Sequence, residues 1–371
     1  MGDPIKTLTI KGFKSIRSLE GFALRNLNIL IGANGSGKSN FVSFFSLLRA
    51  IVRQEMQLLI AKRGGADAHL YLGPKETKEI VGKVYFGQNG YEFSLEPTSD
   101  DRLIFAKETA YYNGSYGETR RPFGAGHTEA KLTERKDDRG MVHEHGVPFY
   151  VYNAVSRWMV YHFHDTSERA AMRRKGTTRH HEELQPDAGN LAAFLLRLRE
   201  QKKATYTLIC DTIRLVAPFF DDFKLRPEPN GGGDTEVLLE WKQKGSSYPF
   251  HPSQLSDGTL RFICLATALL QPHPPATILI DEPELGLHPS ALGVLAGLLK
   301  QAASRTQVVV STQSAPLLDD FAPEEIVVVR RDKGESKFER LDAKNLSEWL
   351  DDYSMGEIWQ KNVVDGGPAH E

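Results

Sequence analysis

The chain has 371 residues, of which 40% are hydrophobic and 25% are charged, and its formal net charge at pH 7 is −2. This is the composition of an ordinary globular protein, and it excludes binding to nucleic acid through overall charge, so any such contact has to rest on a local patch. The only cysteines, Cys210 and Cys264, are far apart, which excludes a disulfide framework and a thiolate zinc site and is typical of a reducing cytosol.

The hydropathy pattern indicates neither a membrane segment nor a secretion signal. The longest apolar run, near residues 262–270, is too short to span a bilayer. The N-terminus lacks the basic head and apolar stretch of a secretory signal. Together with the cysteine usage, the pattern predicts a cytoplasmic protein that has no membrane partner.

The first fifty residues predict two strands and a helix. Residues 8–13 predict an edge strand, and residues 27–31 form a short apolar run that ends in glycine, as a buried strand does. Aromatic residues recur at helical spacing over residues 40–53 and predict a helix. A glycine-rich turn therefore lies between a buried strand and a helix.

The middle of the chain predicts strands, an insertion and two helices. Alternation over residues 79–96 predicts two strands joined by a turn at 88–90. Residues 100–146 are polar, glycine-rich and charged, which predicts loops and short strands of an insertion. The pattern then predicts helices over 168–174 and 190–203, a linker over 227–234 and a strand over 237–241.

The final third has the alternating rhythm of an α/β protein. In chain order, the pattern predicts a helix over 259–270, a strand over 277–280, a helix over 290–303 and strands over 307–311 and 326–330. Strands that alternate with helices predict a largely parallel sheet. Residues 346–359 predict a packed terminal segment.

Residues 32–39 match the phosphate-binding pattern GxxxxGK[ST] without a gap, between a predicted strand and a predicted helix. The glycines of such a loop let backbone N–H groups surround phosphates, and the helix dipole adds to the attraction. Lys38 would reach the β- and γ-phosphates of ATP, and the Ser39 hydroxyl would bind Mg²⁺. A chance glycine-rich turn is the alternative, which the flanking elements disfavour. The expected nucleotide-binding residues of this loop are Gly32, Asn34, Gly35, Ser36, Gly37, Lys38 and Ser39.

Residues 278–282 predict an apolar strand that ends in two acids. A buried strand would bring Asp281 to the Mg²⁺ shell and place Glu282 where it orients the attacking water. Alone, the pattern also fits a helix N-cap, especially with Pro283 next. Its order after the phosphate loop favours the catalytic interpretation.

A third candidate segment, residues 255–259, stands at the start of a predicted helix. Ser256 and Gly258 lie where a hydroxyl, N–H groups and the helix dipole attract an anion. A simple capped helix with Ser256 as N-cap is the alternative. The segment by itself leaves both interpretations open.

The order of these segments resembles that of ABC-class ATPases. Residues 255–259, LSDGT, resemble the ABC signature LSGGQ, with Asp257 and Thr259 as departures. Asn34 and Asn40 are similar to the phosphate loop of the RecF/SMC branch of that class. The resemblance adds Asn40 to the expected nucleotide-binding residues.

The segments after the two acids continue the resemblance. Residues 284–289 look like the D-loop of the branch, and Gln313 stands where the branch usually has a switch histidine. With this switch, the chain resembles the small stand-alone AAA_21-type ATPases over its first fifty residues and everything after about Pro252. A surface glutamine after a strand is the alternative for Gln313. Glutamine carries no charge, so hydrolysis would be slow and little affected by pH near neutrality.

The resemblance implies an α/β fold, namely an ABC-type nucleotide-binding domain with a mixed sheet and a lid-like insertion. Residues 1–55 and 235–371 would form the split ATPase head, and residues 56–234 would form strands and an inserted lid or arm. The reaction would convert ATP and water to ADP and phosphate, with ATP and Mg²⁺ bound. The implied catalytic residues are Glu282, Lys38 and Gln313, and the implied metal ligands are Ser39 and Asp281.

The resemblance also implies an ATP-dependent homodimer whose sites are shared between subunits. In the family, Ser256 and Gly258 complete the site of the other subunit at its γ-phosphate. One expected function is an ATP-driven clamp that acts on DNA in repair or in defence against foreign DNA. The alternative is a regulatory ATPase that switches a separate effector, such as a nuclease, without contacting DNA. The long gap between phosphate loop and signature disfavours a membrane-transporter subunit.

Two basic segments are candidates for contact with DNA phosphates, although a solvated helical face is the usual explanation for such runs. They comprise Arg169, Arg173, Arg174, Lys175, Arg179, His180 and His181, and then Arg197, Arg199, Lys202 and Lys203.

Overall fold

The computed structural model describes residues 3–114, 117–139, 145–230, 232 and 234–364. Two six-stranded sheets form its framework. The first, in the order β2-β1-β4-β5-β6-β7, is antiparallel. The second, in the order β17-β16-β3-β15-β14-β8, is parallel except where β17 pairs with β16. The mixed α/β architecture predicted from the sequence is confirmed.

The first sheet comprises β1 (Ile5–Phe13), β2 (Ile16–Ala23), β4 (Ile80–Phe86), β5 (Asn89–Pro97), β6 (Leu103–Gly114) and β7 (Gly117–Gly124). The second comprises β3 (Leu27–Ile31), β8 (Trp158–Tyr161), β14 (Thr277–Asp281), β15 (Gln307–Thr312), β16 (Ile326–Asp332) and β17 (Glu335–Arg340). Small sheets contain β9 (Gly176–Thr177), β10 (Phe220–Lys224), β11 (Pro227–Pro229), β12 (Thr235–Val237) and β13 (Glu240–Gln243).

The α-helices are α1 (Lys38–Arg53), α2 (Met56–Lys62), α3 (Lys131–Glu134), α4 (Val147–Ser156), α5 (Leu191–Gln201), α6 (Lys203–Val216), α7 (Asp257–Leu270), α8 (Leu292–Ala303), α9 (Ala315–Leu318), α10 (Ala343–Leu350) and α11 (Met355–Gln360). Short 3₁₀ turns are η1 (Asp67–His69), η2 (Ala171–Arg173), η3 (Thr178–His180), η4 (Pro252–Gln254), η5 (Pro289–Ala291) and η6 (Pro323–Glu325). Within the described residues, every helix is too short or too polar to cross a membrane.

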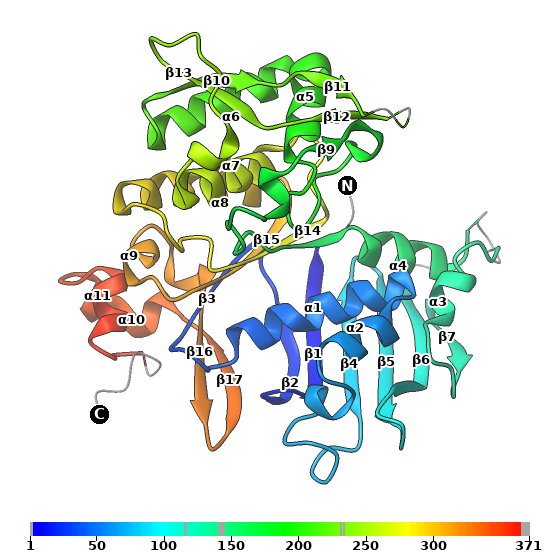
Figure 1. Cartoon of the computed structure of the whole chain (residues 1–371). Helices are drawn as coiled ribbons and strands as arrows, with labels where there is room; N and C mark the ends of the chain where they lie inside the picture. Colours follow the sequence, from blue (N-terminus) through cyan, green and yellow to red (C-terminus); the bar gives the residue numbers. More distant parts are fainter. Residues whose placement is uncertain (1–2, 115–116, 140–144, 231, 233, 365–371) are drawn as a thin grey trace.

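The second sheet is buried on both faces, because its residues alternate between two cores. Ile278 and Ile280 pack with α5, α6, α7 and α8, whereas Leu279 between them packs on the side of α1. This is why the strands read as continuous apolar runs. Figure 1 shows α5 to α8 gathered on one side of this sheet and the antiparallel sheet with α1 on the other.

Helix α1 connects the two sheets through its aromatic residues. Phe44 lies 5.6 Å from Phe13 and 6.2 Å from Phe93 of the antiparallel sheet, measured between ring centroids. Phe45 lies 6.1 Å from Trp158 of the parallel sheet. This packing holds the residues at the start of α1 at a defined place beside β3.

Some predictions for the N-terminal half are wrong. Strand β1 is not an edge strand, since β2 pairs with one side and β4, from a distant segment, pairs with the other. The hairpin turn lies at residues 87–88, because Phe86 pairs with Asn89. Residues 103–114, expected within loops and short strands, form the long strand β6, whose buried Glu108 accepts hydrogen bonds from Tyr91 and from two backbone N–H groups.

The region before the final third also differs from expectation. The predicted helix over 168–174 is only the single turn η2. Its Arg173 side chain is buried and donates to the carbonyl oxygens of Thr166 and Pro252. These tertiary hydrogen bonds, and not a longer helix, hold the segment in place. Helix α6 was not predicted, although its buried Ile209, Cys210 and Ile213 have helical spacing. Gly231 and Gly233 of the predicted linker lie outside the described residues.

The sheets do not follow the predicted division of the chain. Strands β1 and β2, from the first 55 residues, lie in the antiparallel sheet with β4 to β7. Strand β8, from the predicted insertion, pairs with β14 in the parallel sheet. The division into a split head and an inserted region is therefore not a division between sheets, and as a division into domains it stays a prediction.

Candidate active site

Three segments that are distant in sequence meet at one edge of the parallel sheet. Residues 32–37 follow β3, residues 282–284 follow β14, and residue 313 follows β15. The register pairs Asp281 with Ser311 and Thr312 with Ile31, so the carboxyl ends of these strands lie level with one another. Ligands of open α/β sheets bind at such an edge.

The glycine-rich loop can follow its path only with glycine at two positions. A Cβ atom at Gly32 would overlap the carbonyl oxygen of Val329, and one at Gly37 would overlap the Ser336 hydroxyl. Gly37 also has a φ of 113°, which side chains disfavour. Asn34 and Gly35 between them are exposed. The loop is therefore pressed against β16 and β17 and opens outward at its tip.

Two serines hold this loop from outside, and neither was identified from the sequence. The Ser336 hydroxyl donates to the Ser36 carbonyl oxygen at 2.6 Å and shares a 2.7 Å hydrogen bond with the Ser15 hydroxyl. The amide of Asn40, expected at the nucleotide, donates to Ser15 Oγ at 2.7 Å. Since Ser15 and Ser336 lie on separate hairpins, no local motif could reveal them.

The loop contains a buried cation and an unpaired hydroxyl. Lys38 is only 4% exposed, and its Nζ donates to the carbonyl oxygens of Gly32 at 2.7 Å and Ala33 at 3.1 Å. Burial lowers the Lys38 pKa, whereas Glu282 and two other nearby acids act in the opposite direction. The Ser36 hydroxyl is buried without a hydrogen-bond partner. A bound polyphosphate would supply acceptors for both groups.

Oxygen atoms suited to a hard cation lie beside the loop. Ser39 Oγ is 3.5 Å from Asp281 Oδ1, and the Ser311 hydroxyl donates to the same carboxylate oxygen. Hydroxyl and carboxylate oxygens are the ligands that Mg²⁺ prefers. The structure thus brings together the two residues expected to bind Mg²⁺.

Glu282 and Gln313, expected from separate motifs, are in direct contact. The Gln313 side-chain amide donates to Glu282 Oε1. Glu282 has a φ of 44°, a conformation that residues other than glycine rarely adopt and that is frequent at functional sites. Its backbone N–H is held by the Ser311 carbonyl oxygen at 2.8 Å. The glutamine therefore restrains the orientation of the acid.

Glu284, which the sequence indicated only as part of a loop, supports this pair from behind. Its Oε1 accepts from the Thr312 hydroxyl at 2.6 Å and from the Gln313 backbone N–H at 3.0 Å, while Oε2 is buried without a partner. Burial raises the pKa of Glu284 above its ordinary value of 4.5, and the nearby Glu282 acts in the same direction.

The raised pKa predicts a pH-dependent stability. Because the native state holds the Glu284 proton more tightly than the unfolded chain does, the stability that this proton contributes is full below pH 4.5 and is lost as pH rises through the raised native pKa. Glu284→Gln keeps an acceptor oxygen and carries no charge. We expect Glu284→Gln to become more stable than the wild type as pH rises through the native pKa of Glu284. Thermal unfolding over a pH series, with the exposed Glu339→Gln as control, measures the difference, and parallel curves would contradict it.

The signature-like segment presents an exposed helix N-terminus. Ser256 is the N-cap of α7, and its exposed Oγ accepts from the Thr259 N–H at 3.2 Å. Asp257 pairs with the buried Arg173 at 2.8 Å. Within the described residues, no hydrogen bond links Ser256 to the glycine-rich loop. The simple cap is therefore real, and it leaves the helix end open to another molecule.

Gly258 allows α7 to approach the loop after the two acids. A Cβ atom at this position would overlap the Gly286 carbonyl oxygen, and Arg261, one helical turn later, donates to the Leu285 carbonyl oxygen. The glycine therefore has a packing role besides the expected contact with an anion.

We expect Gly258→Ala to destabilise the protein by about 1–3 kcal/mol, because overpacking against backbone cannot relax easily. Gly297→Ala, in α8, is the matched control, since an added Cβ there meets nothing within 4 Å. That control should be neutral or stabilising by about 0.5–1 kcal/mol. Thermal unfolding without nucleotide measures both, and equal melting temperatures would contradict the packing role of Gly258.

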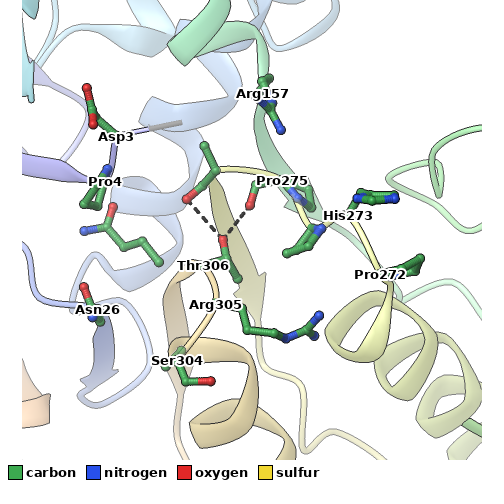
Figure 2. Close-up of a pocket in the computed structure, with 14 residues that line it drawn as sticks. Asp3, Pro4, Asn26, Arg157, Pro272, His273, Pro275, Ser304, Arg305 and Thr306 are labelled. Atoms are coloured by element: carbon green, nitrogen blue, oxygen red, sulfur yellow. Dashed lines mark hydrogen bonds between the residues drawn. The ribbon is translucent and has the colours of Figure 1, made fainter. Parts of the chain in front are cut away.

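A pocket of 440 Å³ lies at the opposite edge of the parallel sheet, where β14 and β15 begin (Figure 2). Two of its polar residues are engaged in the fold. Thr306 donates to the carbonyl oxygens of Pro275 and Ala276, and Arg305 donates to those of Gln271 and Leu269. It contains none of the residues expected at the nucleotide, so its size does not make it the active site.

Comparison with known proteins gives a family and two solved structures of similar fold. The model of the AAA_21 family, described as "AAA domain, putative AbiEii toxin, Type IV TA system", matches residues 27–320. The fold is similar to an SMC head crystallised with the C-winged helix domain of ScpA, with a TM-score of 0.61 at 15% identity over 93% of this chain and 99% of that one. It is also similar to an SMC head from Pyrococcus furiosus with an extended coiled coil, bound to the C-terminal domain of ScpA. That match has a TM-score of 0.56 at 16% identity, over 94% of this chain and 98% of the other.

Proposed function

This chain belongs to the AAA_21 family and is a RecF/SMC-like ABC-class ATPase, and from this premise we propose how its residues divide the work of hydrolysing ATP. Lys38 and the backbone of residues 32–39 bind the phosphates. Glu282 orients the attacking water and accepts its proton, and Gln313 holds Glu282 in position. The contact between the Gln313 amide and Glu282, beside the Ser39–Asp281 pair, carries this proposal.

The residues present fit a nucleotide with its metal. The loop has an unpaired buried hydroxyl at Ser36 and a lysine that is bonded only to its own loop, and both lack the anion that a phosphate would supply. Ser39 and Asp281 would hold Mg²⁺. The metal, when bound, neutralises charge on the phosphate oxygens.

Gln313 acts on Glu282 without titrating. An imidazole at this position would change charge near neutral pH, whereas an amide keeps the same hydrogen bond at every pH. Glu282 therefore retains its orientation across the physiological range. A turnover rate that is flat near neutrality follows from this pair.

We further propose that two copies share their sites in an ATP-dependent homodimer. The exposed N-terminus of α7 supports this, because its Ser256 and N–H groups suit an anion and the same copy's loop makes no hydrogen bond with them in the described residues. A twofold dimer would present each α7 to the phosphate loop of its mate. The test pairs copies with complementary lesions.

The proposed setting is DNA repair or defence against foreign DNA. In the basic segment first expected at DNA, Arg173 is buried, Lys175 pairs with Glu228 at 2.7 Å and Arg179 pairs with Asp234, whereas Arg169 and Arg174 are exposed. In the second segment, Arg199 donates to the Leu225 carbonyl oxygen. The arginine and lysine side chains that are paired in this way are less available to the phosphates of DNA.

A regulatory ATPase that acts on a partner protein is the second candidate. Two structures with this fold were crystallised with domains of ScpA, a separate protein. A titration of ATP turnover with DNA separates the candidates. Stimulation that disappears at high salt supports action on DNA, and turnover indifferent to DNA at low salt supports the regulatory function.

A further inference from the structure

The 440 Å³ pocket at the edge of the parallel sheet opposite the candidate active site is lined by segments that are distant in sequence (Figure 2). Its walls are residues 3–4, Asn26 just before β3, Arg157 just before β8, the α7–β14 loop over 272–276 and the segment over 303–307 that leads into β15. These four strands are neighbours in the sheet, so the pocket, here called the proline pocket, lies along their amino ends. Its volume is within the range of small-molecule sites.

Proline gives this pocket a rigid apolar wall. Pro272, Pro274 and Pro275 stand in the α7–β14 loop, and Pro4 stands on the other side of the pocket (Figure 2). Each proline ring fixes φ and removes a backbone N–H, so the loop loses little conformational freedom when a ligand binds. His273 lies between two of these prolines, and a residue before proline is confined to extended backbone. The backbone that carries His273 is therefore held in place before any ligand arrives.

Arg157 stands beside this loop with a free guanidinium. Its carbonyl oxygen accepts from the Ala276 N–H at 3.0 Å, which fixes the residue next to the end of the loop. In the described part of the chain, the exposed side chains of Arg157 and His273 have neither an ion-pair partner nor a hydrogen-bond partner. Both side chains are therefore available to a ligand.

The helix ends around the pocket are already compensated by other cations. Arg305 donates to carbonyl oxygens at the C-terminal end of α7, and its charge offsets the negative end of the helix dipole. Lys300 stands in the last turn of α8 and acts on that helix in the same way. Asp3 is the one acid among the lining residues, and Figure 2 shows it on the side opposite Arg157 and His273. The side that contains Arg157 and His273 therefore has surplus positive charge.

We propose that the proline pocket binds a small organic anion, with a carboxylate or phosphate group at Arg157 and His273 and an apolar body against the prolines. A guanidinium donates two parallel N–H bonds to such a group, and an imidazole adds a third donor. The prolines, Ala276 and Ala303 offer apolar contact to the rest of the molecule, as in other small-molecule sites. An inorganic ion would leave this wall unused, and a neutral molecule would leave Arg157 unpaired.

The two charges of the pocket allow a test in which substitutions act in opposite directions. Arg157→Gln removes the cation at the proposed anion position, whereas Asp3→Asn removes the acid on the other side of the pocket. Arg174→Gln, at an exposed arginine that does not line the pocket, is the matched control. Arg157 and Asp3 are exposed as well, so all three variants should keep the melting temperature of the wild type.

The probes separate charge from shape. Benzoate and benzamide have nearly the same shape and differ in charge, and phenyl phosphate differs from inorganic phosphate by its apolar ring. Ligand-observed NMR titrations of the nucleotide-free protein measure the affinity of each probe. The same titrations with saturating ADP identify any probe that occupies the nucleotide site instead. The tighter of benzoate and phenyl phosphate identifies the anionic group that the pocket prefers.

With ADP present, at least one of the two organic anions should bind the wild type at least fivefold more tightly than benzamide or inorganic phosphate does. Arg157→Gln should weaken this binding about tenfold, because charge-assisted hydrogen bonds are lost. Asp3→Asn should bind the anion as tightly as the wild type or more tightly, and Arg174→Gln should bind it as the wild type does. Binding that ADP abolishes overturns the proposal, as does equal affinity in Arg157→Gln and Arg174→Gln or a wild type that binds neither organic anion.

Basal turnover of ATP distinguishes this proposal from the proposed catalytic roles, because the pocket contains none of the catalytic residues. Arg157→Gln should keep the basal rate of the wild type. If basal turnover is normal and anion binding is insensitive to Arg157, only the pocket assignment fails. If the wild type has no basal turnover, the proposed catalytic roles fail, whatever the titrations show.

Discussion

Glu282→Gln is expected to lower phosphate release from ATP by about 10²–10⁴-fold, the usual contribution of a positioned general base, while ATP remains bound. The loop that holds the phosphates is built from residues 32–39 and from Ser15 and Ser336, none of which this change touches. Glutamine keeps the oxygen that accepts from Gln313. The variant therefore loses only the negative charge and the ability to accept a proton. Steady-state phosphate release and equilibrium binding of a fluorescent ATP analogue measure the two effects separately.

Two further variants make this result specific. Lys38→Ala should lose binding itself, because Lys38 is the buried cation of the loop. Glu339→Gln, an exposed acid paired with Arg330, should leave both binding and turnover unchanged. Wild-type turnover in Glu282→Gln would show that another group activates the water. Loss of nucleotide binding in that variant would instead show that Glu282 acts on the phosphates.

Ser256→Arg is expected to abolish turnover while each copy still binds ATP. The substitution puts bulk and positive charge at the exposed N-terminus of α7, which in the proposed dimer faces the γ-phosphate of the mate. Ser256 contacts its own helix through Thr259 and makes no hydrogen bond with residues 32–39 in the described part of the chain. A site contained within one copy would therefore tolerate the change. Phosphate release together with sedimentation velocity, with ATP and Mg²⁺ present, measures the outcome.

Mixing Ser256→Arg with Lys38→Ala gives the sharpest form of this test. Each variant alone has a lesion in every site of its homodimer. A mixed dimer has one site with both lesions and one site with neither, because Lys38 of the first copy meets Ser256 of the second. Random pairing of equal amounts should restore about a quarter of the wild-type rate.

The shared site also predicts that nucleotide stabilises the dimer, since a ligand that binds the associated form favours association. Glu282→Gln with ATP and Mg²⁺ should be dimeric at concentrations where the nucleotide-free protein is less tightly associated. No recovery of activity on mixing, together with a monomer under every nucleotide condition and full wild-type turnover, would rule out the shared site.

The sequence by itself determined the parts of the protein whose chemistry is local. The phosphate loop needs a strand, a run of glycines and a helix in direct succession, so residues 27–53 could be interpreted without any partner segment. The apolar strand that ends at Asp281 and the α/β rhythm of the last third follow from side-chain periodicity in the same way. Their order along the chain was enough to indicate an ABC-class ATPase.

Only the tertiary structure decided which residues from distant segments meet. Ser15 and Ser336 support the loop from separate hairpins, and Glu284 supports Gln313 from another strand end. Strand β1 became internal because β4 pairs with its free side. Such contacts depend on how the whole chain packs, and a single sequence holds no local signal for them.

The same reason explains why the most conspicuous basic segment of the sequence is only partly available to a ligand. In the sequence, Arg173 and Lys175 stand in a conspicuous cluster of basic residues. Folding buries Arg173 against backbone carbonyl oxygens and pairs Lys175 with an acid more than fifty residues away. Charge that is available to a ligand is what remains after the fold has paired the rest, and pairing is decided in three dimensions.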